Sequence, residues 1–156
     1  MVSNNVTRML DAKKIAYEVL EIPREKLSAL EVADFLQVAP EIVYKTIVAK
    51  RSGQGKPVLA VVPATGEVDF KKLAKALGEK KMRIPSQREA EEMTGLLAGG
   101  ISALALINKG FQVVVNASAS DQEKIIISAG QRGLQIAISP RDLAVLTRAH
   151  FLEISG

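Results

Sequence analysis

VYKTIVAKRSGQGKPVLAVV, residues 43–62, carries the clearest fold signal in this 156-residue chain. Residues 43–49 and 58–62 are rich in β-branched side chains, and a polar segment that contains two glycines, residues 52–55, lies between them. So short a connection suits an antiparallel pair, because parallel strands need a crossover of about a dozen residues or more. The stretch therefore predicts a β-hairpin.

Outward from the hairpin, polarity patterns predict helices and strands on both sides. Helices are expected at residues 3–14, 28–36, 69–78, 86–95 and 139–147, and further strands at residues 17–22, 113–115, 124–127, 134–138 and 151–154. Two of the helices open with the spacing of a capping box, Ser28 with Glu31 and Ser86 with Glu89. Because several strands are joined too briefly for a helical crossover, antiparallel pairing is expected to be substantial. The order predicts an α+β, or mixed α/β, fold around one twisted or barrel-like sheet, in a single compact domain over residues 1–156.

The composition excludes several classes of protein. The chain is 47% hydrophobic and 24% charged, has no cysteine, and has one histidine, His150. These values fit a soluble globular protein and exclude cysteine nucleophiles, disulfide scaffolds and zinc fingers. The uncharged stretch 94–108 is too short and too rich in glycine to span a bilayer, and the N-terminus lacks the apolar core of a signal peptide. We expect a cytoplasmic protein with no metal, no cofactor and no membrane partner.

Basic residues are concentrated in the middle of the chain. The net charge is +4, and residues 45–83 carry ten basic against three acidic side chains. Such a region is typical of a surface that meets a phosphate-rich partner, although a solvated lysine face has the same composition. An aromatic content of 4% argues against a protein that stacks single-stranded bases. The residues expected to contact an RNA backbone are Lys71, Lys72, Lys75, Lys80, Lys81 and Arg83.

Lys45 is an unusual residue for its strand. Side chains alternate along a strand, so Lys45 shares a face with the apolar residues Val43 and Ile47. One interpretation is a cation held in a polar pocket for a phosphate or a carboxylate. The other is an edge lysine that discourages aggregation. The strand pattern leaves both open.

Two segments that contain glycine are further candidates for a site. Paired glycines such as Gly99-Gly100 let a backbone approach a ligand closely and direct N–H groups at an oxyanion, but they also fit an ordinary tight turn. Residues 127–134 predict a hairpin with a glycine turn, at whose mouth Ser128 and Arg132 are placed to face a pocket.

Taken in order, several short motifs make a more specific pattern. They are Tyr44-Lys45-Thr46, the helix of residues 70–78 with Lys80-Lys81, residues 94–102 ending in Gly99-Gly100-Ile101-Ser102, and Ser128-x-Gly130-x-Arg132-Gly133-Leu134. This set resembles the YbaK family, also called the prolyl-tRNA-synthetase-associated or aminoacyl-tRNA editing domain family, over residues 6–154. The family includes the free-standing cysteinyl-tRNA(Pro) deacylase and the editing insertion of bacterial prolyl-tRNA synthetases. The resemblance implies a mostly antiparallel, barrel-like sheet with flanking helices.

The resemblance also implies roles for residues of this chain. The family's essential lysine matches Lys45 and binds the terminal adenosine of the tRNA and its phosphates. The backbone of the glycine loop, which matches Gly99 and Gly100, positions the ester carbonyl. Family members have no protein nucleophile or general base, so water or the thiol of the substrate attacks. The residues expected to bind the substrate are Thr46, Ile101, Ser102, Ser128, Gln135, Ile22 and Ser28.

Several positions depart from the family pattern, and they bear on the substrate. Ala103 replaces a proline, Ala105 replaces a glycine, and Gln135 replaces an aspartate; Ile22 and Ser28 align with pocket positions that are aromatic in the cysteine-specific deacylase. The resemblance implies a trans-acting aminoacyl-tRNA deacylase that removes a small mischarged amino acid, cysteine or alanine first, from tRNA(Pro) or a related tRNA. Its expected partners are the 3′ acceptor end of the tRNA and, transiently, prolyl-tRNA synthetase or another synthetase. The alternatives are a non-catalytic module that binds tRNA or a synthetase, and a soluble domain that binds anions only incidentally.

Overall fold

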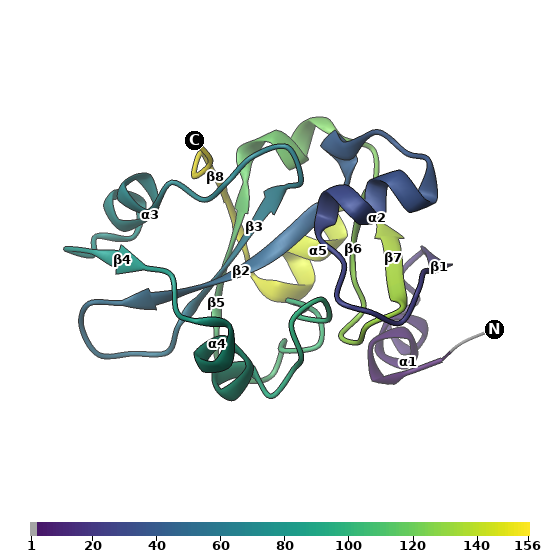
Figure 1. Ribbon diagram of the computed structural model, residues 1–156, viewed down its shortest axis with the longest axis horizontal. Helices are drawn as coiled ribbons and strands as arrows, with labels where there is room; N and C mark the ends of the chain where they lie inside the picture. The colour runs from purple at the N-terminus through teal and green to yellow at the C-terminus, as the bar shows by residue number, and fades with distance from the viewer. Residues whose placement is uncertain (1–2) are drawn as a thin grey trace.

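The computed structural model describes residues 3–156, so residues 1 and 2 of the expected domain lie outside it. In chain order its elements are α1 (Asn5–Ala12), β1 (Tyr17–Glu21), α2 (Ala29–Leu36), the 3-10 helix η1 (Pro40–Ile42), β2 (Tyr44–Arg51), β3 (Val58–Pro63), α3 (Phe70–Leu77), β4 (Met82–Arg83), α4 (Gln87–Thr94), β5 (Gln112–Asn116), the 3-10 helix η2 (Ala117–Asp121), β6 (Ile125–Ser128), β7 (Leu134–Ile138), α5 (Pro140–Thr147) and β8 (His150–Leu152). Figure 1 shows α3 and β4 at one end of the molecule and α1 at the other. Each α-helix has eight residues, and no helix in residues 3–156 is long and apolar enough to cross a membrane.

The strands form two sheets. One has the order β1-β7-β6, and the other has the order β4-β2-β3-β5-β8. Four of the described ladders are antiparallel, whereas β3–β5 and β5–β8 are parallel. The mixed α+β class is thus confirmed, but the expected single barrel-like sheet is replaced by two sheets. An isolated bridge between Val43, just before β2, and Ile126 of β6 links the two sheets, and beyond it residues 44–48 of β2 line a cavity.

Local sequence signals account for most of the elements. The β2–β3 hairpin forms in the register that pairs Tyr44 with Pro63 and Ala49 with Val58. The capping boxes of α2 and α4 are both present, and Asp69 and Ser139 cap α3 and α5. The sequence pattern did not predict β4 or the two 3-10 helices, which are too short to show a periodicity.

Three apolar clusters hold the two sheets and the helices together. The largest lies between the sheets, and it includes Leu10 of α1, Leu59 of β3, Ile136 of β7 and Leu143 of α5. A second packs α3 against the other face of β3, and a third packs α2 against the outer face of the smaller sheet. Since β3 is therefore covered on both faces, all six of its residues are buried, as a continuous apolar run predicts.

Candidate functional site

A cavity of about 520 Å³ opens between α2, β2 and α4. Its walls come from the start of α2, from residues 43–48, from the segment that leads into α4, and from the loop at residues 98–101. Ser128 of β6 and Gln135 of β7 complete the lining. Segments that are far apart in the sequence thus meet at one place, where β2 separates from the smaller sheet.

Lys45 lies on β2 in the wall of this cavity. Its side chain is 23% exposed, and its Nζ donates a hydrogen bond of 2.9 Å to a carboxylate oxygen of Glu67. β2 pairs with β3 from Tyr44 to Ala49, but it pairs with β4 only at Lys50 and Arg51. Lys45 therefore lies where β2 has no described partner strand on its second side, and that open side belongs to the cavity. Lys45 fits both the edge-lysine and the pocket-cation interpretation, because this edge of the strand is also a wall of the cavity.

Strand alternation explains which neighbours of Lys45 reach the core. Tyr44 and Val48 pack into the cluster between the sheets, and Ile47 packs with the cluster under α3. Burial raises the pKa of the Tyr44 phenol above its ordinary value of 10.0, and its hydroxyl is 2.8 Å from Oγ of Ser118. Tyr44 is therefore a neutral hydrogen-bonding group at neutral pH and not a base.

The Gly99-Gly100 loop presses directly against the β6–β7 turn. A Cβ atom on Gly100 would lie 2.9 Å from Cα of Gln131, a distance that real Cβ atoms do not show, so only glycine permits this contact. The Arg132 guanidinium Nε donates a 2.7 Å hydrogen bond to the carbonyl of Ala98, which fixes the loop from the other side. Packing against the β6–β7 turn thus explains why residue 100 must be glycine.

The backbone N–H groups of this loop differ in whether they already have a hydrogen-bond acceptor. The N–H of Gly100 donates to the carbonyl of Leu97 at 2.8 Å, as in a tight turn. The amides of Gly99 and Ile101, two residues of the cavity lining, have no acceptor within residues 3–156. These two N–H groups are therefore the ones that remain for a ligand carbonyl or oxyanion.

Gln135 places a neutral amide on the cavity wall. It lies opposite Ser128 on the neighbouring strand and is only 5% exposed. Within the described part of the chain its side chain has no hydrogen-bond partner, while Oγ of Ser128 accepts from the amide of Gly130 at 3.2 Å. No buried side-chain polar atom in the described residues lacks a partner, so the amide of Gln135 keeps contact with the open cavity and is a candidate contact for whatever fills it.

The other expected site residues are distributed unevenly. Thr46 and Ser28 line the cavity, although Oγ of Ser28 already accepts from the amide of Glu31 at 3.1 Å as the cap of α2. Ile22 and Ser102 are buried outside the lining, where Oγ of Ser102 accepts from the amide of Ala105. Their expected role in substrate binding stays a prediction.

The expected RNA-contacting residues lie on α3, β4 and the segment between them. None of the six lines the cavity, and all are exposed. Lys72 also donates a hydrogen bond of 3.0 Å to the carbonyl of Ser155. Since β4 runs into the segment of Ile84 and Pro85, which does line the cavity, this basic surface adjoins one rim of it.

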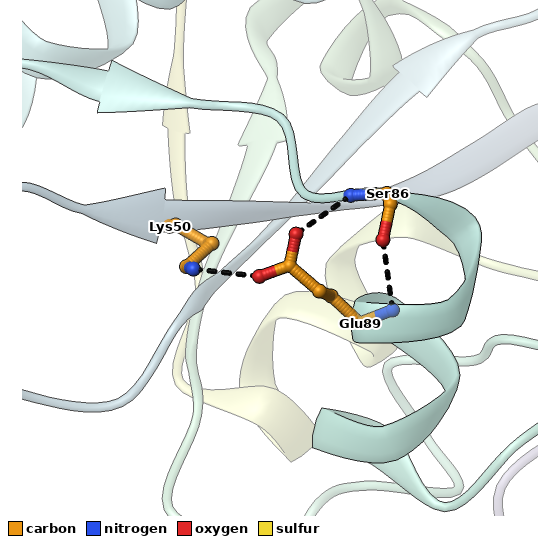
Figure 2. A network of polar contacts seen from close by, with 3 residues as sticks. All are labelled: Lys50, Ser86 and Glu89. Atoms are coloured by element: carbon orange, nitrogen blue, oxygen red, sulfur yellow. Dashed lines mark hydrogen bonds and ion pairs between the residues drawn. The ribbon is translucent and has the colours of Figure 1, made fainter.

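The sequence pattern predicted the Ser86–Glu89 capping box, but it missed the ion pair that ties α4 to β2. Figure 2 shows Glu89 bonded to both Lys50 and Ser86. Nζ of Lys50 is 2.8 Å from a carboxylate oxygen of Glu89, and the other oxygen accepts from the amide of Ser86. The hydrogen bond from Lys50, followed by that from Ser86, lowers the pKa of Glu89 below its ordinary value. A second missed contact, from Lys26 to Gln87, crosses from the loop before α2 to α4.

The site has no donor set for a metal. Within residues 3–156, no group of three or more histidine, cysteine, aspartate or glutamate side chains could hold a metal ion. The charged side chains of the lining are Lys26, Lys45 and Glu67. The chemistry that these groups support is electrostatic binding together with hydrogen bonding.

Comparisons with known proteins show the family to which the chain belongs. A family model described as the aminoacyl-tRNA editing domain matches residues 24–146. A protein of Enterococcus faecalis, provisionally named as the Cys-tRNA(Pro)/Cys-tRNA(Cys) deacylase EbsC, is 37% identical over 97% of this chain and 92% of its own length. The chain belongs to the aminoacyl-tRNA editing domain family. The expected enzyme class, an aminoacyl-tRNA deacylase, is thereby confirmed at the level of the family.

Solved structures share the fold. The hypothetical protein APE2540 has a TM-score of 0.89 at 22% identity, covering 98% of this chain and 100% of its own. A structure described provisionally as a trans-editing enzyme for prolyl tRNA synthetase has a TM-score of 0.79 at 18% identity, covering 100% of this chain and 99% of its own. At these identities the likeness establishes the fold alone.

Proposed function

We propose that this protein is a trans-acting deacylase that removes a small mischarged amino acid, cysteine or alanine, from tRNA(Pro) or a related tRNA. The observation that carries the proposal is the cavity that combines Lys45 with the unbonded amides of Gly99 and Ile101. A cation and a pair of amides suit a phosphate and an ester carbonyl, the two groups that the 3′ end of a charged tRNA offers side by side.

In the proposed mechanism the protein positions and polarises the ester. Lys45 anchors a phosphate of the terminal nucleotide, and the amides of Gly99 and Ile101 donate to the carbonyl oxygen as negative charge develops on it. Water, or the thiol of a cysteinyl substrate, attacks the carbonyl carbon. The carbon–oxygen bond to the ribose then breaks, and the ribose oxygen takes the proton that the attacking group gives up.

Discrimination between amino acids falls to the apolar and polar walls of the cavity. An apolar pocket separates substrates by only about 1–3 kcal/mol per methylene, so size alone is a weak filter. The amide of Gln135 adds a hydrogen-bonding group to the wall, so a substrate that pairs with it is favoured over one that does not. Cysteine is the first candidate for the amino acid removed, because the relative from Enterococcus faecalis is named for cysteinyl-tRNA substrates.

The proposed partners follow from the position of the basic surface. The acceptor end of the tRNA would run from the cavity over α3 and β4, with a synthetase bound transiently as the source of the mischarged tRNA. Residues 1–156 would act as one editing domain, in the cytoplasm, where tRNAs are charged.

Deacylation of a small panel of charged tRNAs tests the proposal. We expect release of one amino acid from Cys-tRNA(Pro), Ala-tRNA(Pro) or Ser-tRNA, and no release from Pro-tRNA(Pro). Lys45→Ala should lower kcat/KM roughly 10- to 100-fold, because a hydrogen bond to a charged group contributes about 1.5–3 kcal/mol. Lys45→Arg should keep part of the activity, since it retains the charge with altered reach. Lys13→Ala, an exposed lysine outside the cavity, is the matched control and should behave as wild type.

The pH profile and tRNA binding complete the test. An anchoring lysine leaves the rate nearly flat through neutral pH, whereas a lysine that acts as general base gives a rate that rises as it titrates. Binding of tRNA with no release from any charged tRNA would contradict the deacylase and favour the non-catalytic module. Unchanged tRNA affinity on Lys45→Ala, also without turnover, would favour incidental anion binding.

A further inference from the structure

Glu67 is the one acidic residue in the described lining of the cavity. It follows the turn after β3, and its carboxylate accepts from Nζ of Lys45 at 2.9 Å. Its side chain is 82% exposed, and that contact is the one side-chain hydrogen bond Glu67 makes within residues 3–156. Its backbone is held, because its carbonyl accepts from the amide of Gly156 at 3.0 Å. The carboxylate is thus carried on a fixed backbone and is free to change partner.

We propose that Glu67 binds the α-ammonium group of the aminoacyl ester. This inference rests on the proposed function and narrows its substrate class to esters with a free α-amine. Esters whose amine is acylated, such as peptidyl-tRNA and formylated aminoacyl-tRNA, then bind more weakly and are spared.

Binding of a charged aminoacyl-tRNA would bring several charged groups together in the cavity. A phosphate that binds Lys45 competes with Glu67 for the ammonium group of the Lys45 side chain. The phosphate also brings further negative charge close to the Glu67 carboxylate. Like charges at such short range are unfavourable unless a cation joins them. A charged aminoacyl-tRNA carries that cation itself, in its α-ammonium group. The Lys45–Glu67 pair of the free protein can therefore exchange for two pairs with substrate, lysine with phosphate and carboxylate with ammonium.

Neutral groups of the cavity cannot take the place of Glu67 in this exchange. Gln135, Ser128 and Thr46 offer oxygen acceptors, but they carry no charge to pair with an ammonium group. Hydrogen bonds between ionised groups are roughly twice as strong as those between neutral ones. Among the residues described in the lining, only Glu67 supplies such a partner.

Binding of a non-hydrolysable analogue tests the inference without turnover. The two probes are the 5′-phosphate of 3′-alanylamino-3′-deoxyadenosine, in which an amide replaces the ester, and its N-acetyl derivative. Calorimetry should show that wild type prefers the free amine by about three- to fivefold, the upper range for an ion pair on an exposed carboxylate. Glu67→Gln, which removes the charge and little else from an exposed side chain, should reduce that preference to about one- to twofold. Glu123→Gln, an exposed carboxylate outside the cavity, should keep it.

The ratio of the two affinities separates ammonium binding from a supporting role toward Lys45. If Glu67 only holds Lys45 in place, Glu67→Gln changes both affinities by the same factor and the preference survives, which overturns the inference. The inference is also overturned if wild type binds both probes equally, or if it binds neither probe. Deacylation of Ala-tRNA(Pro) by wild type is measured in parallel with the binding experiment. If wild type is active but the affinity ratio in Glu67→Gln is unchanged, the inference about Glu67 is overturned and the proposed function stands.

Discussion

At the scale of single residues, Gly100 shows how one missing side chain sets the shape of the site. A Cβ atom there would lie 2.9 Å from Cα and 3.0 Å from the carbonyl carbon of Gln131, and backbone atoms cannot move aside cheaply. The loop that carries the free amides is therefore held at its place in the cavity wall by contact with the β6–β7 turn.

The change Gly100→Ala tests this contact. We expect it to lower the free energy of unfolding by about 1–3 kcal/mol, as overpacking does, and to reduce deacylation because the loop must shift. Gly53→Ala is the matched control, since a Cβ there meets nothing within 4 Å. Its effect should stay within about 0.5 kcal/mol. Equal denaturation midpoints in guanidinium chloride for the two variants would contradict the packing argument.

At the scale of elements, the position of α4 depends on one charged contact. Glu89 closes the capping box with Ser86 and also bonds Lys50 of β2, so a single carboxylate both begins the helix and ties it to the larger sheet (Figure 2). Since Ser86 and Gln87 line the cavity, this contact also places one of its walls.

Glu89→Gln should lower the melting temperature at pH 7, with an effect that disappears in acid. The pKa of Glu89 is lowered from 4.5 in the folded protein, so its stabilisation is complete above that ordinary value. It is lost as the pH falls through the lowered value, where the wild-type carboxylate is protonated. Glutamine retains the capping pattern and removes the ion pair.

Melting curves of wild type, Glu89→Gln and Glu92→Gln from pH 7 to pH 3 measure this effect. Glu92 lies on the same helix and pairs with exposed Arg88, so its change should matter less at every pH. A gap between wild type and Glu89→Gln that stays constant down to pH 3 would show that the ion pair is not its cause.

At the scale of the whole molecule, the exposed basic surface and the cavity occupy different places. The residues that could act on an ester lie in the cavity, while the exposed basic surface extends over α3 and β4 beside it. A long polyanion can therefore be held by many weak contacts while only its end enters the site.

Replacing Lys71, Lys75 and Lys80 together by glutamine should weaken tRNA binding regardless of the amino acid attached. The slope of log affinity against log salt should become shallower by up to about 3, since each phosphate contact contributes close to 0.9. Fluorescence anisotropy across a salt series measures both quantities. The same change at Lys13, Lys14 and Lys124, exposed but elsewhere, should leave the slope unaltered. Equal slopes in the two triple variants would remove α3 from the tRNA path.

Much of the fold could be predicted because its signals are local. The caps Ser28 and Ser86 act on amides three residues away, and the β2–β3 hairpin depends on alternation and a short turn. The position of Lys45 followed from the same alternation. Helix caps and strand alternation involve only a few neighbouring residues, so they do not reveal how strands group into sheets. One sheet was therefore expected where two form.

Patterns along the chain were enough to predict the helices, most strands, the family resemblance and the unusual position of Lys45. Which residues meet in the cavity depends on tertiary contacts. Glu67 reaches Lys45 from 22 positions away, and Glu89 reaches Lys50 from 39. The availability of the Gly99 amide likewise depends on how the loop packs. Hydrogen bonds within a turn or along a strand repeat with a period that a sequence displays, whereas contacts between distant segments depend on how the whole chain packs.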